Sequence, residues 1–286
     1  MIALERDLIL EGDNAQLLPE LPSAAFDLIY IDPPFNTGAR QTARRLQTVS
    51  DDDGDRTGFG GRRYRSEAAS TTRSYEDTHA DYLAFLRPRL EEAHRLLASH
   101  GTLYLHLDPR EAYRVRARLL DEIFGTGAFL NEIVWAYDYG AKPKTRWPAK
   151  HDTILVYVKT PGAHHFDAEA VEREPYMAPG LVTAEKAARG KMPTDVMWHT
   201  IVPTIGSERT GYPSQKPEGL IRRFVAASSK PEGWCLDFFA GSGTLGAVCA
   251  QLGRRFVLID ENPEAIAIMH ARLNLRPAAP AASARS

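Results

Sequence analysis

The sequence predicts a doubly wound α/β fold, in which helices cover both faces of a mostly parallel sheet. Short apolar runs alternate along the chain with segments whose apolar residues recur at helical spacing. Several of these runs are almost continuously apolar, as in strands that are buried on both faces. A chain of 286 residues, 43% of them hydrophobic and 25% charged, can form one large domain or one domain with a sizeable insertion.

Each expected element has its own signal in the sequence. The apolar runs predict strands at residues 26–31, 101–107, 154–158, 234–238 and 256–259. Apolar residues at helical spacing predict helices at residues 82–98, 110–124, 219–227 and 244–253. The last helix is expected to start after Asn262 as its N-cap, with Pro263 at the first helical position and Glu264 in the first turn.

Two segments break this alternation. Residues 39–75 are rich in Gly, Ser, Thr, Asp and Arg, which makes them too polar for a core, and we expect a mobile loop there. Residues 136–212 are less regular and hold many Pro, Gly, Lys and aromatic residues, so we expect a region inserted between two parts of one sheet. The tail at residues 277–286 is rich in Ala, Pro and Ser and is expected to be disordered.

Composition excludes several classes of protein. No signal-peptide pattern follows Met1 and no apolar run is long enough to span a bilayer, so we expect no membrane partner and a cytoplasmic location. Cys235 and Cys249 lie in apolar surroundings without a C-x-x-C pattern, so we expect two buried thiols, with no disulfide and no metal site. The net charge of −2 does not by itself indicate a nucleic-acid-binding protein.

The most specific motif is Asp32-Pro33-Pro34-Phe35, which follows the first predicted strand. The nitrogen of an aromatic amino group is a poor nucleophile because its lone pair is delocalised into the ring. The Asp32 carboxylate and the Pro33 carbonyl can accept its two N–H bonds, which localises the lone pair and stabilises the developing charge. The prolines fix the backbone, and Phe35 offers a flat face for an extruded base. A capped turn with an incidental Asp is the alternative interpretation of this motif alone.

A second motif is a turn in which Gly241 and Gly243 precede the helix that begins at Thr244. Glycine lets backbone approach a ligand, although many strand-to-helix turns use it only for packing. The turn lacks the third glycine of a dinucleotide site and the Gly-Lys pair of a phosphate loop. Asp260 and Glu261 follow the next strand, where carboxylates accept hydrogen bonds from ribose hydroxyls, so a nucleoside cofactor is expected.

Both motifs follow predicted strands. In an open parallel sheet, ligands bind beyond the carboxyl ends of the strands, so we expect the two turns to face one crevice although they are far apart in the chain. A clamp for an amino group beside a nucleoside site predicts methyl transfer to the amino group of a nucleobase.

In these motifs the chain resembles the β-type DNA amino-methyltransferases that use S-adenosylmethionine. The resemblance extends over nearly the whole chain and rests on residues 12–14, 31–38, 131–135, 151–155, 211–217, 237–244 and 260–264. It implies the sheet of S-adenosylmethionine-dependent methyltransferases with an inserted DNA-recognition region. It also implies four parts, which are a catalytic half at residues 1–135, a target-recognition region at 136–212, a cofactor-binding half at 213–276 and the tail.

The same resemblance implies roles for individual residues. The catalytic residues would be Asp32, Pro33, Pro34 and Phe35. Asp13 would contact the cofactor adenine, and Ser214 and Lys216 would border its methionine end. The residues that wrap the cofactor would be Asp237, Phe239, Ala240, Gly241, Gly243 and Thr244, with Asp260 or Glu261 on the ribose. The family commonly has Tyr where this chain has Phe35, a change that keeps stacking but removes a hydroxyl hydrogen bond.

Cations alternate with aromatic residues at the start of the inserted region. Cations suit phosphates and guanine edges, and aromatic faces suit unstacked bases. A solvated charged loop is the alternative, but beside the catalytic motif we favour contact with double-stranded DNA through Trp135, Tyr137, Lys142, Lys144, Arg146, Lys150 and His151. Trp135 or Tyr137 is expected to face the flipped base. Arg62, Arg63 and Arg65 follow the catalytic turn and are expected to bind backbone phosphates.

Other activities fit the sequence less well. Methylation of cytosine C5 needs a thiolate, usually after a proline, and neither cysteine follows one. A zinc deaminase needs ligand spacing that the histidines do not show. An RNA or protein-amide methyltransferase and a non-catalytic DNA-binding regulator are the alternatives, and the intact Asp32 argues against the second. The sequence leaves open a cognate restriction endonuclease and a homodimer.

The target base follows least directly from the sequence. In this family Asp is usual at the first position of the catalytic motif for adenine N6, whereas Ser is frequent for cytosine N4. Phe35 departs from the adenine-type Tyr, and either base can stack on it. The sequence narrowly favours cytosine N4 over adenine N6.

Overall fold

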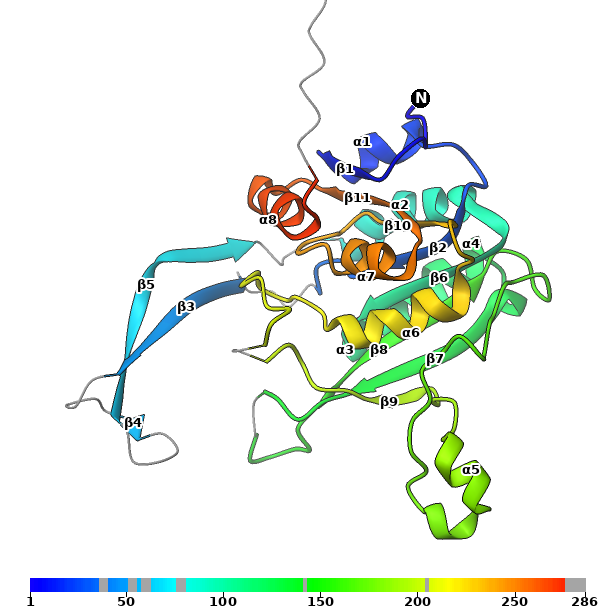
Figure 1. The fold of residues 1–286 in the computed structure, drawn as a ribbon. Helices are drawn as coiled ribbons and strands as arrows, with labels where there is room; N and C mark the ends of the chain where they lie inside the picture. The colour runs from blue at the N-terminus through cyan, green and yellow to red at the C-terminus, as the bar shows by residue number, and fades with distance from the viewer. Residues whose placement is uncertain are drawn as a thin grey trace, which may run out of the picture.

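The computed structural model confirms the doubly wound α/β fold (Figure 1), and it describes residues 1–35, 41–50, 56–57, 63–75, 81–140, 143–203 and 206–275. One sheet of eight strands has the order β1-β11-β10-β2-β6-β8-β7-β9. Its strands are β1 (Leu8–Glu11), β2 (Phe26–Ile31), β6 (Leu97–Leu107), β7 (Phe129–Ala136), β8 (His151–Val158), β9 (Val196–Trp198), β10 (Trp234–Asp237) and β11 (Arg255–Asp260). All neighbouring pairs are parallel except those that β8 makes with β6 and β7.

Helices connect most of these strands. They are α1 (Asn14–Leu17), α2 (Tyr82–Leu96), α3 (Pro109–Val115), α4 (Asp121–Ile123), α5 (Ala184–Arg189), α6 (Glu218–Ser228), α7 (Thr244–Leu252) and α8 (Pro263–Leu273). The predicted cap of the last helix is confirmed, because the Asn262 side chain accepts a hydrogen bond from the backbone N–H of Glu264 at 2.9 Å. The predicted helix at 110–124 is divided by a π-helical turn, Arg116–Leu120, between α3 and α4.

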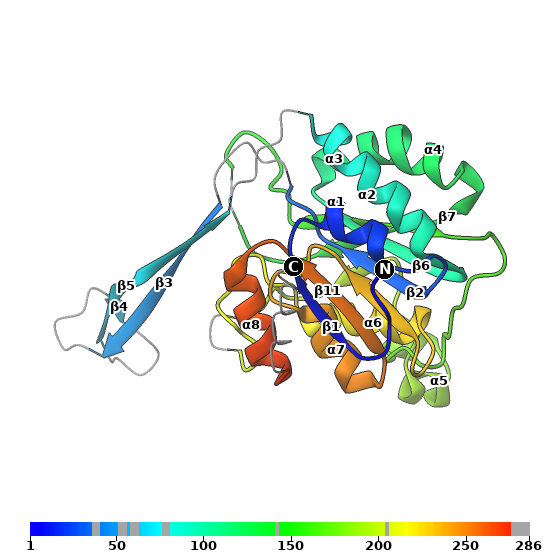
Figure 2. The same cartoon turned by 90° about the horizontal axis from the view of Figure 1, so that it is seen from above.

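Two layers of helices cover the sheet. Figure 2 shows α2, α3 and α4 on one side and α6, α7 and α8 on the other. The central strand β2 is buried throughout, and from Leu28 to Ile31 its side chains alternate between the layers. Ile29 and Ile31 pack with residues of α2, whereas Leu28 and Tyr30 pack with residues of α6. Burial on both faces explains why β2 is apolar at every position except Asp27.

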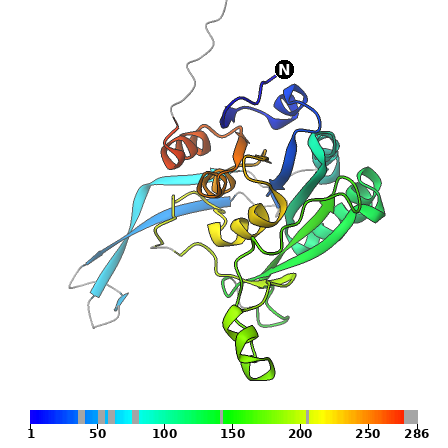
Figure 3. The ribbon, with the colours of Figure 1, turned by 45° about the vertical axis from the view of Figure 1, so that its right-hand side comes forward.

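The polar segment that was expected to be a mobile loop forms strands in its described parts. β3 (Gln41–Ser50), β4 (Arg56–Thr57) and β5 (Arg63–Tyr75) make a separate antiparallel sheet in the order β3-β5-β4. The ribbon of β3 and β5, which we call the arm, projects away from the main sheet (Figures 1 and 3). An antiparallel pair forms backbone hydrogen bonds between its own two strands and can leave its outward-facing groups to water, so a sequence too polar for a core can still form strands.

Other features differ from the sequence-based expectation in detail. β1, β7 and β9 were not predicted, and residues 136–212 supply β8 and β9 to the main sheet. Cys235 and Cys249 are free, buried thiols, as predicted. Within the described part of the chain, no helix combines the length and the apolar character that a membrane span requires. The tail expected to be disordered lies outside the described residues.

The strand directions bring several turns to one edge of the sheet. β1, β11, β10, β2 and β6 are mutually parallel, so their carboxyl ends lie together. β8 runs the opposite way, and its first residues, His151 and Asp152, therefore lie at the same edge. This edge is where both sequence motifs are located.

Candidate active site

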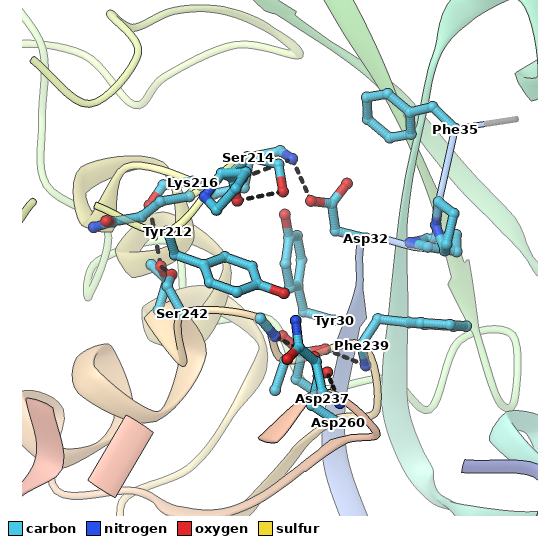
Figure 4. A pocket seen from close by; sticks show the side chains of 18 of the residues that line it. Tyr30, Asp32, Phe35, Tyr212, Ser214, Lys216, Asp237, Phe239, Ser242 and Asp260 are labelled. Atoms are coloured by element: carbon cyan, nitrogen blue, oxygen red, sulfur yellow. Dashed lines mark hydrogen bonds and ion pairs between the residues drawn. The ribbon is translucent and has the colours of Figure 1, made fainter. Parts of the chain in front are cut away.

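A cavity of about 1570 Å³ opens at the carboxyl edge of the sheet (Figure 4). Six continuous segments contribute to its wall, which are residues 12–14, 32–35, 200–203, 211–216, 237–242 and 260–262. The prediction that the two turns face one crevice is therefore confirmed. The cavity is large enough to hold a nucleoside cofactor and a base together.

Asp32 lies in this cavity directly after β2. Its Oδ2 accepts a hydrogen bond from Nζ of Lys216 in an ion pair that is largely buried, with the two side chains 15% and 10% exposed. Its Oδ1 is buried and has no hydrogen-bond partner among the described residues. An unsatisfied buried acceptor costs about 1–3 kcal/mol, so this oxygen is suited to a ligand that brings an N–H. Figure 4 shows Asp32 facing Lys216, with Tyr30 beside it.

The position of Lys216 adds to what its sequence motif implied. The motif places Lys216 at the methionine end of a cofactor, whereas here its ammonium group contacts Asp32. Thr244 donates to the backbone carbonyl of Lys216 at 3.1 Å, which ties this loop to the start of α7. Ser214, two residues earlier, has a left-handed φ of 59° and lines the cavity, so the loop bends sharply there.

We predict that Lys216→Met destabilises the protein by about 3–5 kcal/mol, because it leaves the Asp32 carboxylate buried without its counter-ion. Chemical denaturation measures this change. The double variant Lys216→Met/Asp32→Asn is the matched control and should recover most of the loss, since it removes the stranded charge as well. A single variant as stable as the parent protein would contradict the importance of this ion pair.

Two carboxylates hold the glycine turn in place. Asp237 accepts from the backbone N–H of Phe239 at 2.9 Å, and burial raises the pKa of the Asp237 carboxyl well above its usual range. Asp260 accepts from Gly241 N–H at 2.8 Å and from Asn262 N–H at 2.9 Å, and burial raises its pKa too. Because both Asp260 oxygens already accept from backbone, the exposed Glu261 is the better carboxylate for a ribose hydroxyl.

The two glycines of the turn have different surroundings. Gly241 lines the cavity with φ of +49°, and a Cβ there would lie 3.0 Å from the Tyr212 ring. Gly243 does not line the cavity, although its neighbours Ser242 and Thr244 do. A Cβ on Gly243, whose φ is +71°, would lie 2.7 Å from Cγ of Met269. Backbone conformation and packing against α8 therefore both favour glycine at this position.

One end of the cavity joins a charged cluster to two aromatic rings. Asp13 caps α1 through the N–H of Ala15 at 2.9 Å and pairs with Arg89 at 3.2 Å. The Arg89 guanidinium lies 3.9 Å from the centre of the Phe85 ring, and burial lowers the pKa of Arg89. Phe85 lies 6.0 Å from Phe239, centre to centre. This end offers flat apolar faces and fixed polar groups, which suits the adenosine part of a cofactor.

The opposite end of the cavity contains the aromatic residues that could hold a base. Phe35, Trp135 and Tyr137 all line the cavity. The Phe35 ring lies 5.9 Å from His106, and the Trp135 and Tyr137 rings are 5.0 Å apart. Trp135 is only 2% exposed, and its ring N–H donates to the His199 carbonyl at 2.7 Å, so this wall is fixed before any ligand arrives.

A chain of hydrogen bonds lies beneath this end. The Tyr30 hydroxyl meets Nδ1 of the fully buried His106 at 2.9 Å, and Nε2 of His106 meets Asp152 at 3.1 Å. The Tyr137 hydroxyl donates to the other Asp152 oxygen at 3.0 Å. Burial alone would raise the pKa of Asp152, but hydrogen bonds from His106 and Tyr137 and the charge of Lys216 outweigh it and lower the pKa. Asp152 is therefore ionised at neutral pH.

The residues predicted to bind DNA differ in their exposure and in their position relative to the cavity. Lys144 and Arg146 are exposed, and neither lines the cavity. Lys150 donates to the Gly140 carbonyl at 2.8 Å, and His151 begins β8. Arg63 and Arg65 lie on β5 of the arm. Lys142 and Arg62 lie outside the described residues.

Sequence reasoning missed several cavity residues. Tyr30 could have been identified, because it stands two positions before Asp32 and alternate residues of a strand share a face. No local motif marks Phe85, Arg89 or Asp152 as a cavity residue. The fold brings Arg89, with Phe85 beside it, to Asp13, and it brings Asp152 to Tyr137.

Comparison with known proteins places the chain among DNA-modifying enzymes. Residues 26–271 match a family model for N6/N4 methyltransferases described as DNA methylase. Type II methyltransferase M.HpaI of Haemophilus parainfluenzae is 30% identical over 258 residues, which cover 90% of this chain and 71% of that protein. DNA adenine methyltransferase YhdJ of Escherichia coli K12 is 29% identical over 289 residues, which cover 95% of this chain and 84% of that protein.

Solved structures share the fold. PvuII DNA methyltransferase, described as cytosine-N4-specific, superposes with a TM-score of 0.64 at 16% identity, covering 96% of this chain and 91% of that one. The complex of M1.HpyAVI with S-adenosylmethionine gives a TM-score of 0.59 at 18% identity, covering 94% and 99%. At these identities the structural likeness supports the fold, and the family model and the sequence relatives carry the family assignment.

Proposed function

Because this chain belongs to the N6/N4 DNA methylase family, it is an S-adenosylmethionine-dependent DNA methyltransferase, and we propose that its cavity joins the cofactor to the amino group of one extruded base. The observation that carries this proposal is Oδ1 of Asp32, which has no partner among the described residues and is buried between a glycine turn and a group of aromatic side chains. A base amino group is an N–H donor of the kind that this oxygen lacks.

The described residues fit the cofactor. Bound there, S-adenosylmethionine supplies a methyl group on a sulfonium that leaves as a neutral thioether. Asp13, Arg89 and Phe239 would hold the adenine end, and Glu261 would accept from the ribose. Gly241 leaves backbone open towards the cavity. The further residues proposed for the cofactor are Ser214, Lys216, Asp237, Ala240 and Thr244, all of which line the cavity.

Asp32 and Pro33 act on the base rather than on the cofactor. Asp32 Oδ1 would accept one N–H of the amino group, and the Pro33 carbonyl would accept the other. Acceptors already in place for the charge that develops on nitrogen lower the barrier without reorganisation. Phe35 and Tyr137 would hold the ring of a base that has left the duplex stack.

The target base of this protein is a proposal, because the similar proteins are named for different bases. YhdJ is named an adenine methyltransferase and shares sequence over 95% of this chain, whereas the cytosine-specific PvuII enzyme shares the fold at 16% identity. The Asp at the head of the catalytic motif agrees with the adenine relative. We therefore propose adenine N6 as the first target to test, ahead of the cytosine N4 that the sequence narrowly favoured.

Residues 136–212 are proposed as the target-recognition region. Two large aromatic side chains here, Trp147 and Tyr139, are 94% and 67% exposed, and Lys144 and Arg146 are exposed with them. Exposed aromatic and cationic side chains in this region suit contacts to DNA bases and phosphates. Substitution of Lys144 or Arg146 should alter which sequences are modified more than it alters overall affinity.

We predict that replacing Arg62, Arg63 and Arg65 with Ala weakens binding to all duplexes similarly. The slope of log K against log salt should become shallower by about 0.9 for each phosphate that the variant no longer neutralises. Fluorescence anisotropy at several salt concentrations measures the slope, and Lys144→Ala is the control from the recognition region. A change in the modified sequence, rather than in the slope, would mean that these arginines read bases.

Transfer of labelled methyl groups to duplex DNA, RNA and peptide tests the proposed function, and mass spectrometry of the digested product identifies the base. N6-methyladenine is the expected product. N4-methylcytosine would support the proposed chemistry but reverse the choice of base, and 5-methylcytosine would overturn the mechanism. Sequencing of DNA from an expressing host for modified bases would give the recognition sequence.

Partners and location follow as proposals from the DNA substrate. A cognate restriction endonuclease is a candidate partner, since the relative M.HpaI is a Type II methyltransferase. Because the substrate is DNA, the cytoplasm is the proposed site of action. Sedimentation of the purified protein with and without DNA would test for the homodimer that the sequence leaves open.

A further inference from the structure

The hydrogen-bonded chain beneath the base end follows the order of four adjacent strands. Tyr30 lies on β2, His106 on β6, Asp152 on β8, and Tyr137 follows β7. His106 is fully buried, whereas the other three residues line the cavity. This series of hydrogen bonds therefore runs from β2, the strand directly before Asp32, to the proposed recognition region. Three of its four residues line the space where a base would lie.

The directions of these hydrogen bonds follow from chemistry. An ionised Asp152 can only accept, so Nε2 of His106 and the hydroxyl of Tyr137 donate to it. A neutral imidazole then has only the Nδ1 lone pair left, which accepts from the Tyr30 hydroxyl. Both tyrosine hydrogens point along the chain towards Asp152, which leaves the hydroxyl lone pairs of Tyr30 and Tyr137 to the cavity.

Asp32 also presents an acceptor, as the hydroxyl oxygens of Tyr30 and Tyr137 do, because its buried Oδ1 can only accept a hydrogen bond. All three residues line the cavity, where an amino group brings two N–H bonds to acceptors, whereas a carbonyl oxygen would meet only their lone pairs. Adenine differs from hypoxanthine, and cytosine from uracil, in two ways on rings of nearly the same shape: a carbonyl replaces the amino group, and the adjacent ring nitrogen gains a hydrogen. We propose that the chain from Tyr30 to Tyr137 selects the amino base by fixing the direction of both hydroxyl hydrogens.

This inference rests on the proposed function, since it assumes that the amino group enters beside Asp32. In it, His106 and Asp152 are positioning residues that act through the two tyrosines. The preference for an amino base over a keto base does not require transfer of the methyl group, so it is measurable as a ratio of binding affinities.

Asp152→Asn should release one hydroxyl hydrogen into the cavity. If the amide oxygen accepts from His106, the amide nitrogen donates to Tyr137, whose own hydrogen is then free to turn to the cavity. If the amide is reversed, its nitrogen donates to Nε2 of His106, Nδ1 donates to Tyr30, and the Tyr30 hydrogen is freed instead. In either orientation one tyrosine O–H becomes a donor in the cavity wall, and this donor can form a hydrogen bond to the carbonyl oxygen of a keto base.

The test compares dissociation constants for duplexes that carry the recognition sequence. The target base is either the natural amino base or its keto counterpart, hypoxanthine for adenine or uracil for cytosine, placed opposite an abasic position so that base pairing does not differ. S-adenosylhomocysteine is present to prevent turnover. The parent protein should prefer the amino base on the order of 10-fold to 100-fold, and Asp152→Asn should bring this ratio close to 1.

Tyr104→Phe is the matched control. It removes another buried hydroxyl hydrogen bond, to Ser228 at 2.7 Å, from a residue on the same strand as His106 that does not line the cavity. Its amino-to-keto ratio should equal that of the parent protein. A change in ratio as large as that of Asp152→Asn would mean that general loosening of the sheet, rather than hydrogen-bond direction, sets the preference, and it would overturn the inference.

An unchanged ratio in a folded Asp152→Asn protein also overturns the inference. Should that variant fail to fold, Tyr137→Phe decides, because it removes one acceptor from the cavity without adding a donor. It should strengthen binding of the keto duplex severalfold, because one lone pair no longer faces the carbonyl oxygen, and it should change binding of the amino duplex less. Affinities equal to those of the parent for both duplexes would reject the proposal. Loss of methyl transfer in Asp32→Ala tests the proposed function separately, and it does not depend on the ratio in Asp152→Asn.

Discussion

Replacement of Asp32 by alanine is expected to slow methyl transfer by a factor on the order of 10²–10³ while leaving affinity for S-adenosylmethionine nearly unchanged. The variant removes the buried oxygen that has no partner among the residues that the structure describes, and with it one of the two acceptors for the amino group. Single-turnover transfer of labelled methyl groups measures the rate, and calorimetry measures cofactor affinity. Turnover close to that of the parent protein would reject the assigned role.

Asp32→Asn is the informative companion to this variant. Lys216 only donates, so it should take the amide oxygen of the substituted side chain as its partner, as it takes Oδ2 of Asp32. The amide N–H groups would then point to where the base amino group enters, and donor would meet donor. We expect Asp32→Asn to be as slow as Asp32→Ala despite its close similarity in shape to the parent residue. A rate restored to within a few-fold of the parent protein would show that shape, and not an acceptor at Oδ1, is what the reaction needs.

Gly243→Val is expected to abolish measurable cofactor binding and to destabilise the fold. A valine there must adopt a φ of +71° and place its Cβ 2.7 Å from Met269. The left-handed conformation costs about 1–2 kcal/mol, and overpacking costs typically about 1–3 kcal/mol more. Relief of the clash would displace Ser242 and Thr244, which line the cavity. Calorimetry with the cofactor and thermal unfolding measure the two effects.

Gly253→Val separates the two causes. Gly253 also has a left-handed φ, +66°, but a Cβ there meets no atom of the described residues within 4 Å. This control should lose stability through backbone strain alone and should bind the cofactor like the parent protein. Normal cofactor affinity in Gly243→Val would mean that α8 can move away without disturbing the turn.

The sequence predicts those features that local patterns encode. The strand 26–31 was predicted at its observed bounds, because burial on both faces leaves a run that is apolar except for Asp27. The cap at Asn262 was predicted because capping needs only neighbouring residues. The meeting of Asp32 with the glycine turn was predicted because parallel strands share a carboxyl edge.

Features that depend on tertiary contacts were not predictable in this way. Composition indicated that residues 39–75 are polar, but not that backbone pairing would organise the described parts of this segment into strands. The pairing of Lys216 with Asp32 joins residues from opposite halves of the chain. The contact of His106 with Asp152 depends on the antiparallel pairing of β6 and β8, since no sequence signal specified which residues would lie opposite one another.

The arm has a consequence for the length of DNA that the protein covers. β5 spans 13 residues, and at roughly 3.3 Å per residue it extends for about 40 Å. Duplex DNA rises about 3.4 Å for each base pair, so an arm laid along it would shield about 12 base pairs, a little more than one helical turn. Because the arm leaves the chain shortly after the catalytic turn, on one side of the main sheet, the protected stretch would extend further to one side of the modified base than to the other. A nuclease footprint of this protein would then be asymmetric about the modified base, and deletion of the arm would make the footprint shorter and more nearly symmetrical.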